Sequence, residues 1–262
     1  MSPPIPRRRL LRLGLAGLGA LPLAGCKTFD FLADPNDPTR DVLVSANRLT
    51  KEVQRSLQGR RALATEYTMA DLRQGQKPNG TTDPQDPAYL ALKAQGFRDY
   101  RLSVTGAVAR PVTFSLADLH ALPQQSQITR HDCVEGWSAI AKWSGVRLAH
   151  VLTRVQPTAQ ARFLMFECFD TMEQGLSGAV KYYETIDMVD ALHPQTILAV
   201  GMNDQPLPVA NGAPVRLRVE RQLGYKMAKY VRAIHVIPDF RQIEGGRGGY
   251  WEDRGYAWYA GI

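Results

Sequence analysis

The chain contains the stretch Arg130-His131-Asp132-Cys133-Val134-Glu135-Gly136-Trp137-Ser138, which sets a cysteine among charged residues, ahead of a glycine and a tryptophan. A cysteine that fills core space usually has apolar neighbours, so this setting is typical of a thiolate ligand or a nucleophile. A disulfide is a third possibility, because Cys26 and Cys168 are the other cysteines of the chain. All three roles of Cys133 are open on these grounds.

The residues around this cysteine predict β-structure. We expect a strand from Ile128 to Val134, and the alternation of a strand places His131 and Cys133 on one face. His131 is therefore a candidate to assist a thiolate or to contact a bound anion. A lone histidine is more often a surface or core residue, so His131 by itself indicates little.

The rest of the chain indicates one mixed, β-dominated domain. Short helices are predicted at 116–122, with Ser115 as the cap and Asp118 as the acid of a capping box, and at 147–155. A weak helical pattern covers 42–57. Further strands are predicted at 101–105, 112–114, 161–169, 196–202, 215–220 and 230–237. The aromatic residues of the tail, 245–262, are expected to pack over an edge of the core.

The first 26 residues are typical of an export segment. Arg7, Arg8, Arg9 and Arg12 precede a short apolar run that is too short to span a membrane comfortably. The arginines resemble a twin-arginine signal, and Leu23-Ala24-Gly25-Cys26 resembles a lipobox. We therefore predict a periplasmic protein anchored through a lipid on Cys26, a polar spacer over 27–65 and a catalytic domain over 66–262. An ordinary signal peptide is the alternative.

Composition and charge exclude few functions. The chain has 262 residues, of which 44% are hydrophobic and 22% are charged, as in ordinary globular proteins. The formal net charge is +7, and removal of the four N-terminal arginines leaves about +3. Such a mild excess indicates no nucleic-acid partner.

Three separated blocks give the chain a resemblance to a known family. The first is Cys133 to Ser138, followed by Lys142-Trp143-Ser144-Gly145-Val146. The second runs from His193 through Asn211-Gly212-Ala213-Pro214-Val215-Arg216, and the third is Gly224-Tyr225-Lys226-Met227-Ala228-Lys229. In this order they resemble the sulfite oxidase family of molybdopterin-dependent oxidoreductases, near the branch with the periplasmic methionine-sulfoxide reductase catalytic subunit.

The resemblance implies the mixed α+β sulfite oxidase-type fold and a molybdenum-molybdopterin cofactor, with Cys133 as the protein ligand of the metal. A soft thiolate suits a transition metal, and a pterin phosphate needs cations or backbone N–H groups. The positions that match cofactor contacts are Asn211, Arg216, Lys226, Met227, Ala228 and Lys229, with Asn79 in a more loosely matching polar loop over 75–87. Without the resemblance, the basic residues among them would be read as a solvated strand face.

Cys168 departs from the family, which has a cofactor-contacting threonine at this position in the methionine-sulfoxide reductase branch. On a strand it shares a face with Leu164, Phe166 and Asp170. Cys168 either contacts the edge of the cofactor or is an inert buried thiol. The arginine-rich cysteine motif of the sulfite oxidases proper is also replaced here by Gly136-Trp137, so sulfite is not favoured as the substrate.

The predicted function is oxygen-atom transfer between the molybdenum and a small-molecule oxo-donor or acceptor. No haem-attachment motif occurs in the chain, so electrons are expected to pass to or from a separate membrane or periplasmic haem partner. Two alternatives stay open. One is a cysteine hydrolase with His131 as the base of Cys133, and the other is a non-catalytic binding lipoprotein.

Overall fold

The fold is seen in a computed structural model, which describes residues 37, 39–59, 61–73, 77–175 and 178–262. The predicted export segment and the lipid site at Cys26 lie outside these residues, and the domain boundaries stay predictions. Two compact units divide the chain, residues 1–45 and 46–262. Residues 39–45 of the first unit belong to helix α2, Thr39–Gln58, and the sheets, the core and the candidate site described below lie in the second unit.

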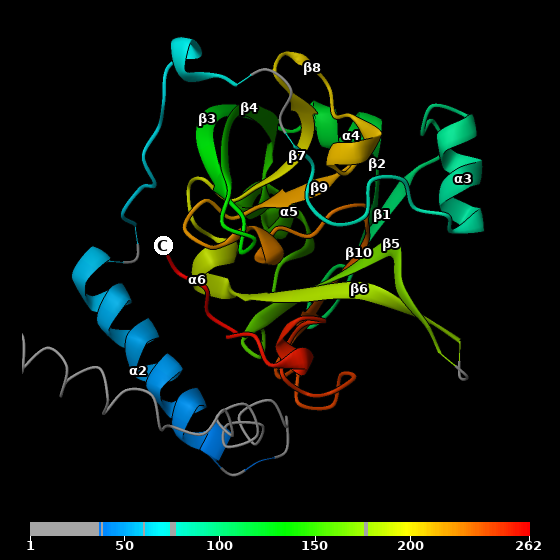
Figure 1. Ribbon diagram of the computed structural model, residues 1–262. Coiled ribbons are helices and arrows are strands. Elements are labelled where there is room, and N and C mark those ends of the chain that lie inside the picture. The colour runs from blue at the N-terminus through cyan, green and yellow to red at the C-terminus, as the bar shows by residue number, and fades with distance from the viewer. Residues whose placement is uncertain (1–36, 38, 60, 74–76, 176–177) are drawn as a thin grey trace, which may run out of the picture. The chain divides into compact units, whose positions relative to one another are not determined.

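The first sheet contains five strands in the order β2-β1-β10-β5-β6 (Figure 1). β1 and β10 are parallel, and the other neighbouring pairs are antiparallel. The bounds are β1 Arg101–Gly106, β2 Val112–Ser115, β5 Phe163–Gly175, β6 Gly178–Asp187 and β10 Val231–Ile237. These strands confirm the predictions for 101–105, 112–114, 161–169 and 230–237, whereas β6 was not predicted.

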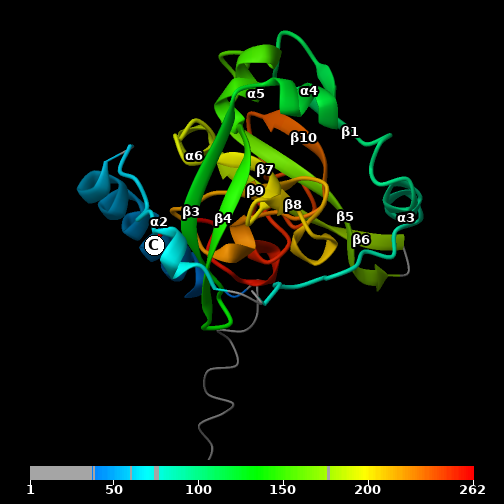
Figure 2. The same cartoon turned by 90° about the horizontal axis from the view of Figure 1, so that it is seen from above.

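The second sheet has the order β3-β4-β7-β8, and β9 pairs with β7. Figure 2 shows the long β3–β4 hairpin from above. The bounds are β3 Gln124–Asp132, β4 Ser138–Arg147, β7 Ile197–Met202, β8 Gln205–Pro206 and β9 Arg216–Arg218. The strand that we predicted up to Val134 ends at Asp132, which pairs with Ser138 of β4. Cys133 is therefore the first residue of the hairpin loop, and the predicted alternation that joins it to His131 is wrong.

The described residues also form helices, of which α2 and α3 precede the first strand and the others lie between strands. They are α2 Thr39–Gln58, α3 Pro87–Ala94, α4 Leu116–Ala121, α5 Leu148–Val155 and α6 Met188–Ala191, with 3-10 turns η3 Met69–Asp71, η4 Val209–Asn211, η5 Gly224–Lys226 and η6 Glu252–Arg254. The predicted capping box begins α4, since Ser115 accepts from Asp118 and the Asp118 carboxylate accepts in return. No helix in the described part is long and apolar enough to cross a membrane.

One large apolar cluster holds the first sheet together with α4 and α5. Leu102, Leu164 and Ile234 contribute to it from the strands, and Val151 and Leu152 contribute from α5. The amphipathic pattern of α5 explains this arrangement, because Leu148, Val151, Leu152 and Val155 fall on one helix face. The molecule is the mixed, strand-rich α+β structure that the sequence predicted.

The aromatic residues of the tail, 245–262, pack over an edge of this core, as the sequence predicted. Tyr250 and Tyr259 are buried, and Tyr250 belongs to the large cluster. Trp251 stacks on Tyr256 with ring centroids 5.2 Å apart. The tail therefore covers the core with some of its aromatic rings and leaves others partly open to solvent.

Candidate functional site

A cavity of about 160 Å³ lies where six separate segments meet. Three segments that the sequence predicted to be functional contribute to its walls, namely the loop 75–87, the segment around Cys133 and the block 224–229. Its walls are Asn79, Gly80, Thr81, Cys133, Val134, Glu135, Asp170, Met172, Tyr182, Gly224, Tyr225, Met227, Lys229, Trp251 and Tyr256. This convergence makes the cavity the candidate site.

Cys133 reaches the cavity from a tight turn. Its backbone N–H donates to the carbonyl oxygen of Trp137 at 2.9 Å, and the Gly136 N–H donates back to the Cys133 carbonyl at 3.0 Å. Gly136 has a φ of +85°, a conformation that a side chain would strain. The glycine that follows the cysteine in the sequence is thus the residue that lets the hairpin close and present the thiol.

Neither the Cys133 thiol nor the Cys168 thiol is in a disulfide. Cys133 is half-buried, and Cys168 is fully buried. The disulfide that the sequence left open is not formed. Burial raises the pKa of the Cys133 thiol, with the Glu135 carboxylate acting in the same direction. A metal ion deprotonates such a thiol on binding, but a cysteine nucleophile needs a lowered pKa. The arrangement therefore disfavours the hydrolase alternative.

His131 is a buried residue of β3 in the second sheet. Its Nδ1 accepts from the Arg218 guanidinium at 2.9 Å, which leaves the proton of the neutral ring on Nε2. Burial, and then Arg218, lower the pKa of His131 well below its usual value. Nε2 has no hydrogen-bond partner among the described residues. The ring presents a free donor, which favours the predicted anion contact over the role of a base for Cys133.

Gly224, a wall residue of the cavity, allows the His131 ring to lie close. A Cβ at this position would lie 2.4 Å from His131 Cε1 and 2.5 Å from Nε2. Only glycine therefore fits between the imidazole and the cavity. In the block 224–229, Gly224 therefore matters because it lacks a side chain and leaves room for the His131 ring.

Arg216 is buried and incompletely paired. Its Nη1 donates to the carbonyl oxygen of Asn211 at 2.9 Å, and its guanidinium lies 4.9 Å from the centre of the Trp143 ring. Nε and Nη2 have no partner within the part of the chain that the structure describes. Burial, and next the neighbouring Arg218, lower the pKa of Arg216 to about 9, so the charge persists at neutral pH. A buried cation with two unused donors is suited to an anionic ligand.

Lys229 joins the loop 75–87 to this region. Its ammonium donates to the carbonyl oxygens of Asn79, Thr81 and Ala210. Burial, and then Arg216, lower the pKa of Lys229 to about 7. The loosely matched Asn79 thus lies in the cavity wall, held by the lysine that the sequence block 224–229 predicted.

The remaining predicted residues fall into different environments. Met227 lines the cavity, and Ala228 is buried, with its carbonyl accepting from Leu217 of β9. Lys226 does not line the cavity, because its ammonium pairs with Glu184 and Glu252 at 2.5 Å each. Cys168 is also absent from the walls and belongs to the apolar cluster, where burial raises its pKa well above the usual range. Of its two predicted roles, the structure favours the inert thiol.

The sequence did not identify every wall of the cavity. Asp170 is buried and lines it, as do Trp251 and Tyr256 of the tail. The available signal for Asp170 was a carboxylate on the same face of a strand as the apolar Leu164 and Phe166. Trp251 and Tyr256 gave no signal beyond their aromatic character, which indicated packing alone.

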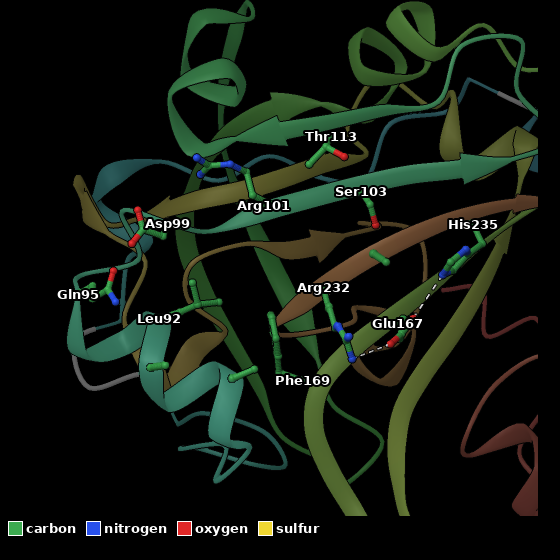
Figure 3. Close-up of a pocket in the computed structure, with 13 residues that line it drawn as sticks. Leu92, Gln95, Asp99, Arg101, Ser103, Thr113, Glu167, Phe169, Arg232 and His235 are labelled. Atoms are coloured by element: carbon green, nitrogen blue, oxygen red, sulfur yellow. Dashed lines mark hydrogen bonds and ion pairs between the residues drawn. The ribbon is translucent and has the colours of Figure 1, made fainter.

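A second hollow of about 590 Å³ lies on the outer face of the first sheet, beside α3 (Figure 3). There Glu167 pairs with Arg232 at 3.1 Å and accepts a hydrogen bond from His235 at 3.4 Å. None of the residues predicted from the sequence lines this hollow. Glu167, Arg232 and His235 are paired with one another and partly exposed, unlike the buried and unpaired Arg216 near the cavity.

The donors near the cavity fit a phosphate-bearing pterin with a thiolate-held metal. Arg216 and His131 have buried N–H groups without a partner in the described chain, as an anion would require. Gly212 has a φ of +114°, and a Cβ there would lie 3.1 Å from both Arg216 Cβ and Lys229 Cβ. The chain therefore brings two cations together at a glycine and leaves a soft thiol in the adjoining cavity.

Comparison with known proteins gives an independent result. The family model described as the oxidoreductase molybdopterin binding domain matches residues 89–242. A candidate protein-methionine-sulfoxide reductase subunit, YedZ1, of Azospira oryzae is 44% identical over 162 residues, which cover 62% of this chain and 56% of that protein. The protein-methionine-sulfoxide reductase catalytic subunit MsrP of Xanthomonas axonopodis pv. citri is 33% identical over 241 residues, which cover 88% of this chain and 70% of that protein.

The chain thus spans little more than half the length of the first of these relatives. Among solved structures, the sulfane dehydrogenase SoxCD of Paracoccus pantotrophus matches with a TM-score of 0.48 and 21% identity. That match covers 54% of this chain and 39% of the other.

Proposed function

Because this chain belongs to the family of oxidoreductase molybdopterin-binding domains, we propose that it transfers an oxygen atom at a molybdenum centre whose protein ligand is Cys133. The family match confirms the predicted class of enzyme, a molybdenum cofactor-dependent oxidoreductase, and the predicted cofactor. The ligand, the substrate and the electron partner are the proposed parts.

The observation that carries the proposal is the position of the Cys133 thiol. It faces a cavity that Lys229 and the Asn79 loop also line, near buried donors of Arg216 and His131 that lack partners in the described residues. A single soft ligand next to a phosphate-binding set is the arrangement that a metal held by a pterin dithiolene needs. When bound, the molybdenum supplies a two-electron centre that exchanges an oxygen atom with a substrate.

The residues of the chain have separate tasks in this proposal. Arg216 and the His131 Nε2–H would bind the phosphate, and the Asn211 segment positions Arg216 through its carbonyl oxygen. Lys229 would hold the Asn79 loop against the cofactor, since its three N–H donors already bond to carbonyl oxygens. Met227 and the Asn79 loop form walls that orient the ring system. Tyr225, Trp251 and Tyr256 narrow the cavity with aromatic surface, which limits the entry of water and can hold an apolar part of a substrate.

The proposed substrate class is an organic sulfoxide. Two relatives are named as subunits of protein-methionine-sulfoxide reductases, and methionine sulfoxide combines a polar oxygen with an apolar thioether chain. Reduction of such a sulfoxide consumes two electrons and two protons and releases water. The electrons would come from a separate redox partner, because the chain has no haem-attachment motif.

We also propose export to the periplasm, with an anchor at Cys26. The support is the sequence alone, namely the arginines at 7–12 and the Leu23-Ala24-Gly25-Cys26 segment. Expression of the full chain with and without Cys26→Ser, followed by membrane fractionation, tests this part. A Cys26→Ser protein that remains in the membrane fraction would contradict the anchor.

The central experiment measures metal and activity together. Protein purified from a cofactor-competent host should contain about one molybdenum per chain by elemental analysis and give an electron paramagnetic resonance signal of molybdenum. It should then oxidise a reduced dye when methionine sulfoxide is added. Protein without molybdenum would refute the proposal, whereas molybdenum without sulfoxide reduction would refute only the substrate class.

A further inference from the structure

Asp170 is a buried carboxylate in the cavity wall, with 4% of its surface exposed. Its Oδ1 has no hydrogen-bond partner anywhere in the described chain. The Thr81 side chain hydrogen-bonds the same carboxyl group. Each carboxylate oxygen has two acceptor positions, so this group retains capacity for at least two more donors.

An irregularity in strand β5 turns the Asp170 side chain toward the cavity. The pairing of β5 with β6 is interrupted between Glu167 and Thr171, and three consecutive residues, 168–170, are buried where a regular strand would alternate. Phe169 lines the outer hollow, whereas Asp170 lines the cavity. A bulge that turns a side chain toward a cavity is a common device at functional sites.

Lys229 does not supply the missing hydrogen bond to the Asp170 carboxylate. The Lys229 ammonium has three N–H donors, and the carbonyl oxygens of Asn79, Thr81 and Ala210 take all three. Lys229 therefore attracts Asp170 through space without bonding to it. Burial raises the pKa of Asp170 to about 6, against the lowering effect of Lys229.

A buried acceptor without a partner is costly, and folded proteins rarely keep one unless a ligand completes it. The missing partner must approach from the cavity, because protein surrounds the carboxylate elsewhere. It must donate hydrogen bonds, since an ionised carboxylate only accepts them. A flat ring edge with two parallel N–H groups would satisfy both oxygens at once.

We propose that the Asp170 carboxylate binds the 2-amino and ring N–H groups of the pterin, the amidine-like edge of the cofactor. This inference rests on the proposed function, because it requires a pterin in the cavity. Paired N–H donors on a carboxylate form strong, directional hydrogen bonds in the fork geometry known from guanidinium groups. Asp170 would therefore orient the ring, while Arg216 and the His131 Nε2–H hold the phosphate.

The test compares the rate of pterin release from three holoenzymes in dilute urea. They are the natural protein, Asp170→Asn and Glu167→Gln. The last is a matched control, because it also removes a carboxylate from β5, but on the outer face that Figure 3 shows. Released pterin is measured by the fluorescence of its oxidised form, and molybdenum by elemental analysis.

We expect Asp170→Asn to release pterin about 10- to 100-fold faster, as the loss of charged hydrogen bonds implies. Glu167→Gln should stay within about twofold of the natural protein, because it leaves the cavity unchanged. Equal release from Asp170→Asn and the natural protein would overturn the inference. So would an Asp170→Asn protein that keeps its pterin and loses activity, since that pattern assigns Asp170 to proton transfer.

Folding is checked by circular dichroism, with Asp170→Ser as a second neutral variant. If both variants unfold, Asp170 is a structural residue and the inference fails. A natural protein that contains neither pterin nor molybdenum refutes the proposed function itself. Pterin in the natural protein with unaffected release from Asp170→Asn refutes this inference alone.

Discussion

Arg218 and Arg216 lie two residues apart on β9, and both are buried against Trp143, yet the regions around them differ. Arg218 donates to Glu220 at 2.9 and 2.6 Å and to His131. Gln127 adds a hydrogen bond to the same Glu220 carboxylate at 2.8 Å. Arg216 faces no carboxylate at ion-pair distance in the described chain, and two of its nitrogens lack partners.

The same difference separates whole clusters. Away from the cavity, Lys226 pairs with Glu184 and Glu252, and Arg221 pairs with Asp190 at 3.0 Å. Around the cavity, Arg216 and Asp170 keep unused hydrogen-bonding atoms within the region that the structure describes. Single atoms of Arg221 and Glu252 also lack a hydrogen-bond partner, but each of these residues has an opposite charge within 3.0 Å, whereas Arg216 and Asp170 have no ion pair among the described residues. A buried charge without a counter-ion is unfavourable for the isolated fold, which favours this region as the place where a ligand completes the structure.

Removal of the Cys133 thiol should have the largest effect on the function of the cavity region. Cys133→Ser should lose molybdenum and lower sulfoxide reduction at least about 1000-fold, which equals about 4 kcal/mol of activation free energy. The free energy of unfolding of the metal-free protein should change by less than about 1 kcal/mol, because the side chain is only half-buried. Elemental analysis, dye oxidation and urea unfolding measure these effects.

Cys168→Ala is the matched control for this change. The Cys168 thiol belongs to the apolar cluster, so its removal should cost stability and leave the molybdenum content unchanged. Loss of molybdenum from Cys168→Ala, or its retention in Cys133→Ser, would contradict the assignment of the ligand.

The two arginines of β9 give the next largest effect. Arg218→Met leaves Glu220 buried without its cation, and we expect a loss of about 3–5 kcal/mol in the free energy of unfolding of the metal-free protein. Arg216→Met removes a charge that has no counter-ion in the described chain, so its effect should stay within about 1 kcal/mol. Urea unfolding of both variants checks this, and equal losses would abolish the distinction between the regions.

The carboxylate of Asp170 should make stability depend on pH. Its pKa is about 6 in the fold against the usual 3.8, so the metal-free fold is favoured while the group is protonated. That contribution is complete below about pH 4 and is lost as the pH rises through about 6, at a cost of up to about 3 kcal/mol. Asp170→Asn should therefore be the more stable protein at pH 7.5 and show no advantage at pH 4.

Thermal unfolding of the two metal-free proteins across this pH range measures the difference. A natural protein whose stability does not fall relative to Asp170→Asn between pH 4 and 7 would show that the carboxylate has a partner after all.

The smallest effect is expected on the outer face. Arg232→Ala removes the ion pair with Glu167, in which Arg232 is 54% exposed. Exposed pairs contribute little, so the free energy of unfolding should change by less than about 1 kcal/mol, with no change in molybdenum content. A larger loss in urea unfolding, or a loss of metal, would assign this hollow a role in the function.

Much of the architecture follows from local pattern. The continuous apolar run 161–169 predicted β5, and the capping box of Ser115 and Asp118 predicted α4. β6 was missed because Glu184, Thr185 and Asp187 are buried in it, and polar residues in a strand indicate exposure unless their partners are known. Those partners, such as Lys226 for Glu184, come from distant segments.

The site was predicted only in part, because some of its residues are placed by contacts with distant segments. Cys133 and Lys229 have neighbours in the sequence that carry the family resemblance, and the structure places both in one cavity. Asp170 has no such neighbours, and its direction depends on an interrupted pairing between β5 and β6 that no local pattern reveals. His131 was noticed, but its contact with Arg218, 87 positions away, decides its protonation.

The walls of the cavity have a consequence for the order of events during synthesis. They range along the chain from Asn79 to Tyr256, so synthesis must pass Tyr256 before the last wall exists. The β3–β4 hairpin is contiguous in sequence and can present its thiol early, but nothing then encloses the thiol. A cofactor that needs every wall can thus be loaded only after Tyr256 has been synthesised, and shorter nascent chains cannot compete for it.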